Sequence, residues 1–148
     1  MSYFERRLHI DAPPAVVWGV LADVARWPEW TASMRKLVPQ GGGPLGAGSR
    51  VLVTMRGTPG SVWRVTAYEE GRSFTWETER GVRVSAGHLI EQDGAGSKVT
   101  LSLRTSGVLA ALFSLVIRPM SRRNMQLEAE GLKHRSEERA RPAGPAPD

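Results

Sequence analysis

The chain has 148 residues, of which 41% are hydrophobic and 24% are charged, so it fits one globular domain with room for a core and a cavity. It contains no cysteine, which excludes thiol catalysis, disulfides and cysteine zinc sites. The 20 Lys and Arg against 15 Asp and Glu give a net charge of +5, but acidic residues are interleaved with the basic ones, so we expect no nucleic-acid partner.

Neither the N-terminal residues nor the longest apolar stretch has the pattern of a secretory signal or a membrane span. The N-terminal run MSYFERRLHI carries charges where a secretory signal needs apolar residues, and the longest apolar stretch, Val108 to Ile117, is interrupted by Ser114. We therefore expect no transmembrane segment and a cytoplasmic location.

A weakly alternating strand is expected over Tyr3 to Ile10, and Asp11 with two prolines ends it. Those prolines suit the first turn of a helix, where no N–H is needed, and apolar residues then recur at helical spacing up to Val24. Asp23 can cap a second short helix that Pro28 ends. The N-terminal region is therefore predicted to be one strand and two short helices.

Six short strands are expected next, because apolar runs alternate with turns that contain glycine. They lie at 34–38, 50–55, 61–68, 73–78, 82–91 and 98–105. Consecutive hairpins predict an antiparallel meander. The loop GGGPLGAGS, between the first two, lacks the Lys-Ser/Thr ending of a phosphate-binding loop and precedes a strand, so it is either an entrance lid or a plain linker.

A long C-terminal helix is expected after Gly107. Its apolar stripe consists of Leu109, Leu112, Phe113, Val116 and Met120. Pro119 lies inside this helix, which predicts a kink or a break near Ile117. We expect residues 1–141 to form a single domain and residues 142–148 to be a disordered tail.

Strand parity predicts which side chains face inwards, because every second residue points to the same side of a sheet. The expected inward set is almost wholly apolar, although a one-residue bulge would invert part of it. It comprises Val51, Val53, Met55, Trp63, Val65, Ala67, Phe74, Trp76, Ala86, His88, Ile90, Val99, Leu101 and Leu103. The polar candidates for an acid–base cluster, Arg56, Arg64, Glu77, Ser85 and Arg104, have outward parity and are expected in cross-strand salt bridges.

His88 is the one titratable residue in the inward set. An imidazole there can orient or protonate a bound ketone or enol; the alternative is a half-buried histidine satisfied by a hydroxyl or a backbone group. His9 and His134 have neither metal-type spacing nor an obvious carboxylate partner, so we expect both at the surface and no metal site.

Three stretches of the chain resemble a known superfamily. APPAVVWGVLADVARWPEW is similar to the first-helix signature of the SRPBCC proteins, also called START-like or Bet v 1-like. WRVTAYEEGRSFTWE resembles their strand-turn-strand unit, and EAEGLKHRSEE resembles the end of their last helix. The resemblance covers nearly all of positions 3 to 138 and is closest to the polyketide cyclase/dehydrase-like branch.

This resemblance implies an α+β helix-grip (Bet v 1/START-like) fold. In that fold a curved seven-stranded antiparallel sheet surrounds a long C-terminal helix, with two short helices after strand 1, and the cavity between them receives a small hydrophobic molecule. The expected ligand-binding residues are Trp30, Met34, Val53, Met55, Trp63, Val65, Trp76, His88, Leu103, Phe113 and Val116. No catalytic set carries across, because catalytic residues differ between branches; His88 is the only catalytic candidate, and no cofactor is expected.

Three functions are therefore open. The protein binds or transports a small hydrophobic molecule such as a lipid or polyketide; it is a polyketide cyclase/aromatase or dehydratase; or it is a protein- or membrane-interaction module. The last rests on Arg118, Arg122 and Arg123, which follow the apolar run of the C-terminal helix. We expect a monomer or a homodimer.

Overall fold

The structure, a computed structural model, describes residues 2–141, and the expected tail at 142–148 lies outside the described residues. The strands are β1 (Ser2–Ile10), β2 (Met34–Gln40), β3 (Arg50–Met55), β4 (Ser61–Glu69), β5 (Ser73–Thr78), β6 (Arg83–Asp93) and β7 (Gly96–Ser106). The helices are α1 (Pro14–Ala22), the 3-10 helix η1 (Val24–Glu29), α2 (Val108–Leu112) and α3 (Ser114–Ala140).

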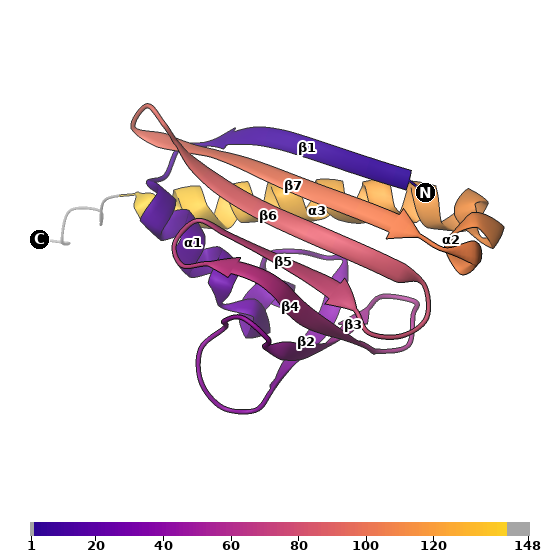
Figure 1. Ribbon diagram of the computed structural model, residues 1–148. Coiled ribbons are helices and arrows are strands. Elements are labelled where there is room, and N and C mark those ends of the chain that lie inside the picture. Colours follow the sequence, from indigo (N-terminus) through magenta and orange to yellow (C-terminus); the bar gives the residue numbers. More distant parts are fainter. Residues whose placement is uncertain (1, 142–148) are drawn as a thin grey trace, which may run out of the picture.

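The seven strands form one antiparallel sheet in the order β1-β7-β6-β5-β4-β3-β2. Strands β2 to β7 follow one another as hairpins, and β1 pairs with β7 at the far edge. The sheet curves around α3, while α1 begins at the end of the molecule opposite α2 (Figure 1). This is the expected helix-grip fold, and each predicted strand is present.

A bulge in β4 changes one part of the predicted inward set. The pairing of β4 with β5 shifts register between Val65 and Ala67, so the alternation of side chains restarts there. Ala67 is consequently exposed, and the prediction that it faces inwards is wrong. Tyr68 turns inwards instead, with its ring edge-on to Trp18 at 5.7 Å.

Aromatic residues from η1 and β5 join the helices to the sheet. Trp27 is fully buried and donates its indole N–H to the Leu21 carbonyl at 2.9 Å, which ties η1 to α1. Its ring lies 5.2 Å from that of Trp76 and 6.5 Å from that of Phe74. Burial of such large apolar surfaces fixes this end of the molecule.

The C-terminal helix breaks four residues earlier than predicted. A turn at Phe113 separates α2 from α3, and the Phe113 carbonyl accepts hydrogen bonds from the N–H groups of Val116 and Ile117 to start α3. Helix α3 continues through Pro119, so the expectation of a break near Ile117 is wrong. Pro119 is exposed in the second turn of α3, and its missing N–H removes one backbone hydrogen bond, the one that the Leu115 carbonyl would accept.

The middle of α3 is held against the chain after η1 by Gly131. A Cβ atom at Gly131 would overlap the Trp30 carbonyl oxygen, so only glycine permits this approach. The neighbouring Ala129 and Leu132 are fully buried. This contact sets the distance of α3 from the chain after η1. Over the described residues, no helix is long and apolar enough to cross a membrane.

Candidate functional site

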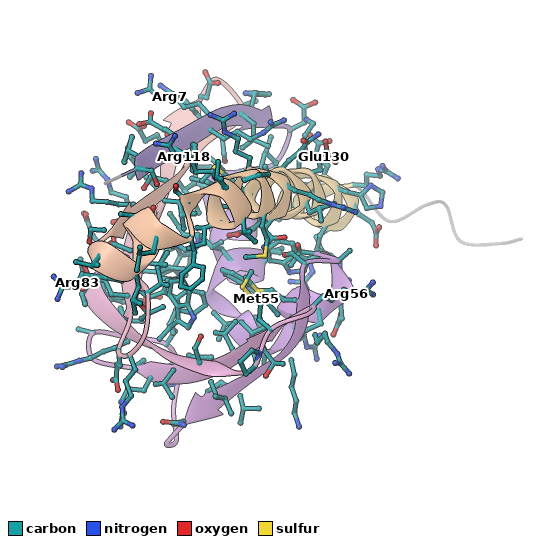
Figure 2. The ribbon with its side chains drawn as sticks, turned by 90° about the vertical axis from the view of Figure 1, so that its right-hand side faces the viewer. Arg7, Met55, Arg56, Arg83, Arg118 and Glu130 are labelled. Carbon is teal, nitrogen blue, oxygen red and sulfur yellow. The ribbon has the colours of Figure 1, made fainter. Side chains whose placement is uncertain are left out.

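A cavity of about 230 Å³ lies between the curved sheet and α3. Its walls are strands β3 to β7, the start of β2 and one face of α3. Figure 2 views the molecule from the end where α2 lies, with Met55 between α3 and the sheet. The lining is largely apolar and includes Trp27, Met34, Val53, Met55, Trp63, Trp76, Val82, Val84, Ala86, Leu101, Leu103, Ile117, Met120 and Met125.

One face of α3 closes the cavity. Its lining residues are Ile117, Met120, Ser121, Asn124, Met125 and Glu128. They recur every three or four positions, which places them on a single stripe of the helix. The stripe is apolar near the start of α3 and becomes polar towards Glu128, so the cavity has an apolar mouth and a polar inner end.

His88 forms the polar inner end from the sheet side. Its side chain is only 3% exposed, and its ring stacks on Phe74 with centroids 4.3 Å apart and an interplanar angle of 20°. Trp27 and Trp76 meet the ring edge-on at 5.6 and 5.9 Å. These three aromatic side chains hold the imidazole in one orientation.

Both ring nitrogens of His88 face oxygen acceptors. Nδ1 lies 3.2 Å from the Phe74 carbonyl oxygen, which can only accept, so Nδ1 carries a proton. Nε2 lies 3.1 Å from Oε1 of Glu128, whose side chain is 15% exposed. The contact therefore holds one proton between the two groups: either an imidazolium faces a carboxylate, or a neutral imidazole accepts from a carboxylic acid.

This His88–Glu128 pair is the arrangement that the sequence interpretation missed. His88 was recognised from strand parity, whereas Glu128 lies 40 residues away on α3. The apolar stripe predicted for this helix was Leu109, Leu112, Phe113, Val116 and Met120, with a kink or a break near Ile117, and it ended before Glu128. Of that stripe only Met120 lines the cavity, and counting forward from Met120 by fours reaches Asn124 and Glu128.

Seven of the eleven expected ligand-binding residues line the cavity: Met34, Val53, Met55, Trp63, Trp76, His88 and Leu103. Trp30 and Val65 do not; Val65 is buried in the core, and Trp30 packs on Trp27 with ring centroids 5.3 Å apart. Phe113 and Val116 are 55% and 66% exposed and also lie outside the lining, because the turn at Phe113 directs them to solvent.

The outward-facing polar residues behave only partly as expected. Arg56, Arg64, Glu77 and Arg104 are exposed, and Ser85 is half-buried. Within residues 2–141 none of the charged members forms an ion pair within 4.0 Å, which contradicts the predicted salt bridges. Arg50 and Glu79 form one instead at 2.6 Å, and the guanidinium lowers the pKa of Glu79.

His9 has the carboxylate partners that the sequence did not indicate. Its Nδ1 lies 2.8 Å from Asp93 at the β6–β7 turn, and its Nε2 lies 2.8 Å from Asp11 before α1. The hydrogen bond to Asp93, and then the one to Asp11, raise the pKa of His9. His9 is exposed, as expected, and joins three segments far from the cavity.

Comparison with known proteins is consistent with this geometry. The model of the family described as polyketide cyclase / dehydrase and lipid transport matches residues 1–137. The chain therefore belongs to this family. Comparison with curated proteins gives no significant sequence match.

Solved structures share the fold at low sequence identity. The Zhui aromatase/cyclase from a Streptomyces species superposes with a TM-score of 0.77 at 18% identity, covering 98% of this chain and 99% of that one. A hypothetical protein from Helicobacter pylori gives 0.79 at 16%, covering 91% and 88%. A START superfamily protein from Mycobacterium smegmatis gives 0.72 at 11%, covering 92% and 97%.

Proposed function

We propose that this protein binds and transports a small hydrophobic molecule with one hydrogen-bonding group, in the cavity between the sheet and α3. The observation that carries the proposal is a largely apolar cavity whose few polar lining side chains include Ser121, Asn124 and the His88–Glu128 pair. Lipid transport is also part of the family description. Pockets of this kind take affinity from the apolar walls and orientation from a few polar groups.

The cavity volume indicates the size of ligand to test. An engineered apolar cavity of roughly 150 Å³ takes up benzene. The volume here is about 230 Å³, which suits a bicyclic ring system or a short branched chain. We therefore expect 2-naphthol to bind more tightly than naphthalene, because its hydroxyl can reach the polar end.

A matched pair of variants tests whether the cavity is the binding site. Ala86→Leu adds bulk to the cavity wall between Trp76 and Leu103, whereas Ala67→Leu adds the same bulk to the exposed face of β4. Overfilling a packed space costs about 1–3 kcal/mol, so Ala86→Leu should weaken 2-naphthol binding roughly tenfold or more while Ala67→Leu leaves it unchanged. Tryptophan fluorescence measures both, because Trp27, Trp63 and Trp76 line the cavity.

Native mass spectrometry of the freshly purified protein, followed by organic extraction, would identify a retained ligand. A stoichiometric hydrophobic molecule supports the proposal. An empty protein in which Ala86→Leu and Ala67→Leu bind 2-naphthol equally would refute it.

The His88–Glu128 pair favours one second function, cyclisation or dehydration of a poly-ketone. In such a reaction a general base removes a proton from the carbon between two carbonyl groups, and the resulting enolate carbon attacks a ketone of the same chain. The alkoxide that forms takes up a proton. Loss of this hydroxyl together with a hydrogen from the neighbouring carbon then releases water. The pair holds one transferable proton at the cavity wall, as such steps require.

Glu128→Gln separates the two functions. The amide can donate a hydrogen bond to Nε2 of a neutral His88, so the ring stays in place while the transferable proton is lost. A carrier should retain 2-naphthol binding within a few-fold in this variant. An enzyme should retain binding but lose conversion of a poly-β-ketone thioester, followed by chromatography, and unchanged conversion would rule out a role for the pair.

A further inference from the structure

Exposed apolar side chains concentrate on one part of the surface. Within residues 2–141, seven of the nine exposed large hydrophobic residues lie between Val108 and Met120, a segment that we call the α2–α3 elbow. Val108 is 77% exposed and Leu115 is 91% exposed. The other elbow members are Leu109, Leu112, Phe113, Val116 and Met120. Single exposed apolar residues are ordinary, but a contiguous group marks an interaction surface.

Arginines surround the elbow. The sequence from Gly107 to Leu127 contains three arginines and no acidic residue. Figure 2 shows Arg83 and Arg56 on opposite sides of this end of the molecule, with Arg118 on α3. Among the described residues, Arg56, Arg83, Arg118 and Arg123 have no ion-pair partner within 4.0 Å.

We propose that the α2–α3 elbow docks on the surface of an anionic lipid bilayer. Its apolar side chains would enter the boundary between headgroups and acyl chains, and the arginines around it would contact anionic headgroups. The positive charge around the elbow favours an anionic lipid surface over a second copy of the chain. A twofold contact between two elbows would bring like-charged arginines together, which disfavours a second copy of the chain.

Docking at the elbow would bring the cavity mouth to the bilayer. Ile117 and Met120 line the cavity, and Met120 also belongs to the exposed elbow, so the two surfaces are continuous. A hydrophobic molecule can then pass between membrane and cavity without crossing water. This last step rests on the proposed function, whereas docking itself does not require a ligand.

Flotation of the full-length protein with phosphatidylcholine vesicles, with and without phosphatidylserine, tests the docking. Binding is expected only with phosphatidylserine and should weaken as salt is added. The double variant Arg118→Gln, Arg123→Gln should weaken vesicle binding roughly twenty- to thirtyfold, because each arginine contributes about fivefold and the two contributions multiply. The control pair is Arg72→Gln with Arg139→Gln, two exposed arginines at the β4–β5 turn and at the end of α3, which should change it little.

A second pair of variants tests the apolar contribution. Leu115→Ser should weaken vesicle binding about tenfold, whereas Val38→Ser, at an exposed position on β2, should not. Both sites are exposed, so folding is unaffected. Absence of binding at low salt would overturn the proposal, as would equal losses in elbow and control variants. A change only in sedimentation velocity on Leu115→Ser would instead identify the elbow as a contact between copies.

The two proposals fail separately. Ala86→Leu should lose 2-naphthol and still float with phosphatidylserine vesicles, and the arginine pair should do the reverse. If Ala86→Leu also abolished flotation without unfolding, the elbow would not be an independent docking surface.

Discussion

Gly131 positions Glu128 against His88, and a methyl group there tests this directly. In Gly131→Ala the added Cβ would overlap the backbone carbonyl of Trp30, which cannot rotate away, so α3 must move. Alanine favours the helical conformation over glycine by about 1 kcal/mol. Displacement of α3 also loosens the packing of Ala129 and Leu132, both fully buried, and overpacking of this kind costs about 1–3 kcal/mol or more at a rigid site.

A cost at the upper end of this range, less the gain of about 1 kcal/mol in helix propensity, leaves a net loss of about 2 kcal/mol in the free energy of unfolding for Gly131→Ala. For a domain of this size that lowers Tm by roughly 4–10 °C in a thermal scan. The matched control is Gly19→Ala in α1, where nothing lies within 4 Å of the new Cβ and the residue is exposed. It should raise stability by about 0.5–1 kcal/mol, since only helix propensity changes.

The same variant should disturb the cavity. Glu128 precedes Gly131 by one helical turn, so movement of α3 lengthens the contact of 3.1 Å between Glu128 and Nε2 of His88. Nitrogen NMR of the His88 ring should show a changed Nε2 chemical shift in Gly131→Ala, where the hydrogen bond to Glu128 is disturbed, and none in Gly19→Ala. If both variants raised Tm alike, the close approach of α3 to Trp30 would be refuted.

Three further predictions concern pH and the helix. The raised pKa of His9 stabilises the fold below the unfolded pKa, and this contribution is lost as pH rises through the folded pKa. His9→Gln should therefore lower the urea midpoint at pH about 5.5 and leave it unchanged at about 9; a pH-independent difference would contradict this. Burial, and then Glu70, raises the pKa of Tyr68 to about 12. The hydrogen bond to Glu5 raises the pKa of Tyr3. Ultraviolet titration should therefore place both tyrosinate steps higher in the native protein than in the urea-unfolded protein, and equal midpoints would contradict this. Pro119→Ala restores an N–H for the Leu115 carbonyl in an exposed turn and should stabilise the protein by about 1–2 kcal/mol in thermal unfolding, whereas a lower Tm would mean that the ring is needed where it stands.

The strands were predictable because their signals are local. Each apolar run ends in residues that favour a turn, such as Glu70-Gly71 between β4 and β5, where Gly71 adopts a φ of 77°. Alternation within a strand then assigns its faces, which placed His88, Trp76 and Met55 inwards correctly. These signals need no knowledge of the rest of the chain.

Two local irregularities carry no comparable signal. The bulge after Val65 reverses the sides of the sheet that Ala67 and Tyr68 face. The residues on either side of it alternate in a way that fits a strand with the bulge and a strand without it equally well. At the C-terminal helix, Pro119 is the strongest helix breaker in the sequence, yet the break lies at Phe113. Pro119 removes only the hydrogen bond that the Leu115 carbonyl would accept, on an exposed side of α3, so the helix tolerates it and the break lies elsewhere.

The site depends on how these irregularities combine with tertiary packing. Helix α3 is fixed at two points: the turn at Phe113 sets where it begins, and Gly131 sets how near it comes to Trp30. Ile117 and Glu128 are about three helical turns apart, so they lie on the same face of α3 and both line the cavity. Glu128 reaches Nε2 of His88 only with this approach. Phe113 and Gly131 do not line the cavity, yet they position α3. They therefore determine whether His88 stands alone or is paired with Glu128. The alternation of residues in its strand was enough to identify His88. Identifying Glu128 as its partner requires the position of α3, which the sequence pattern does not give.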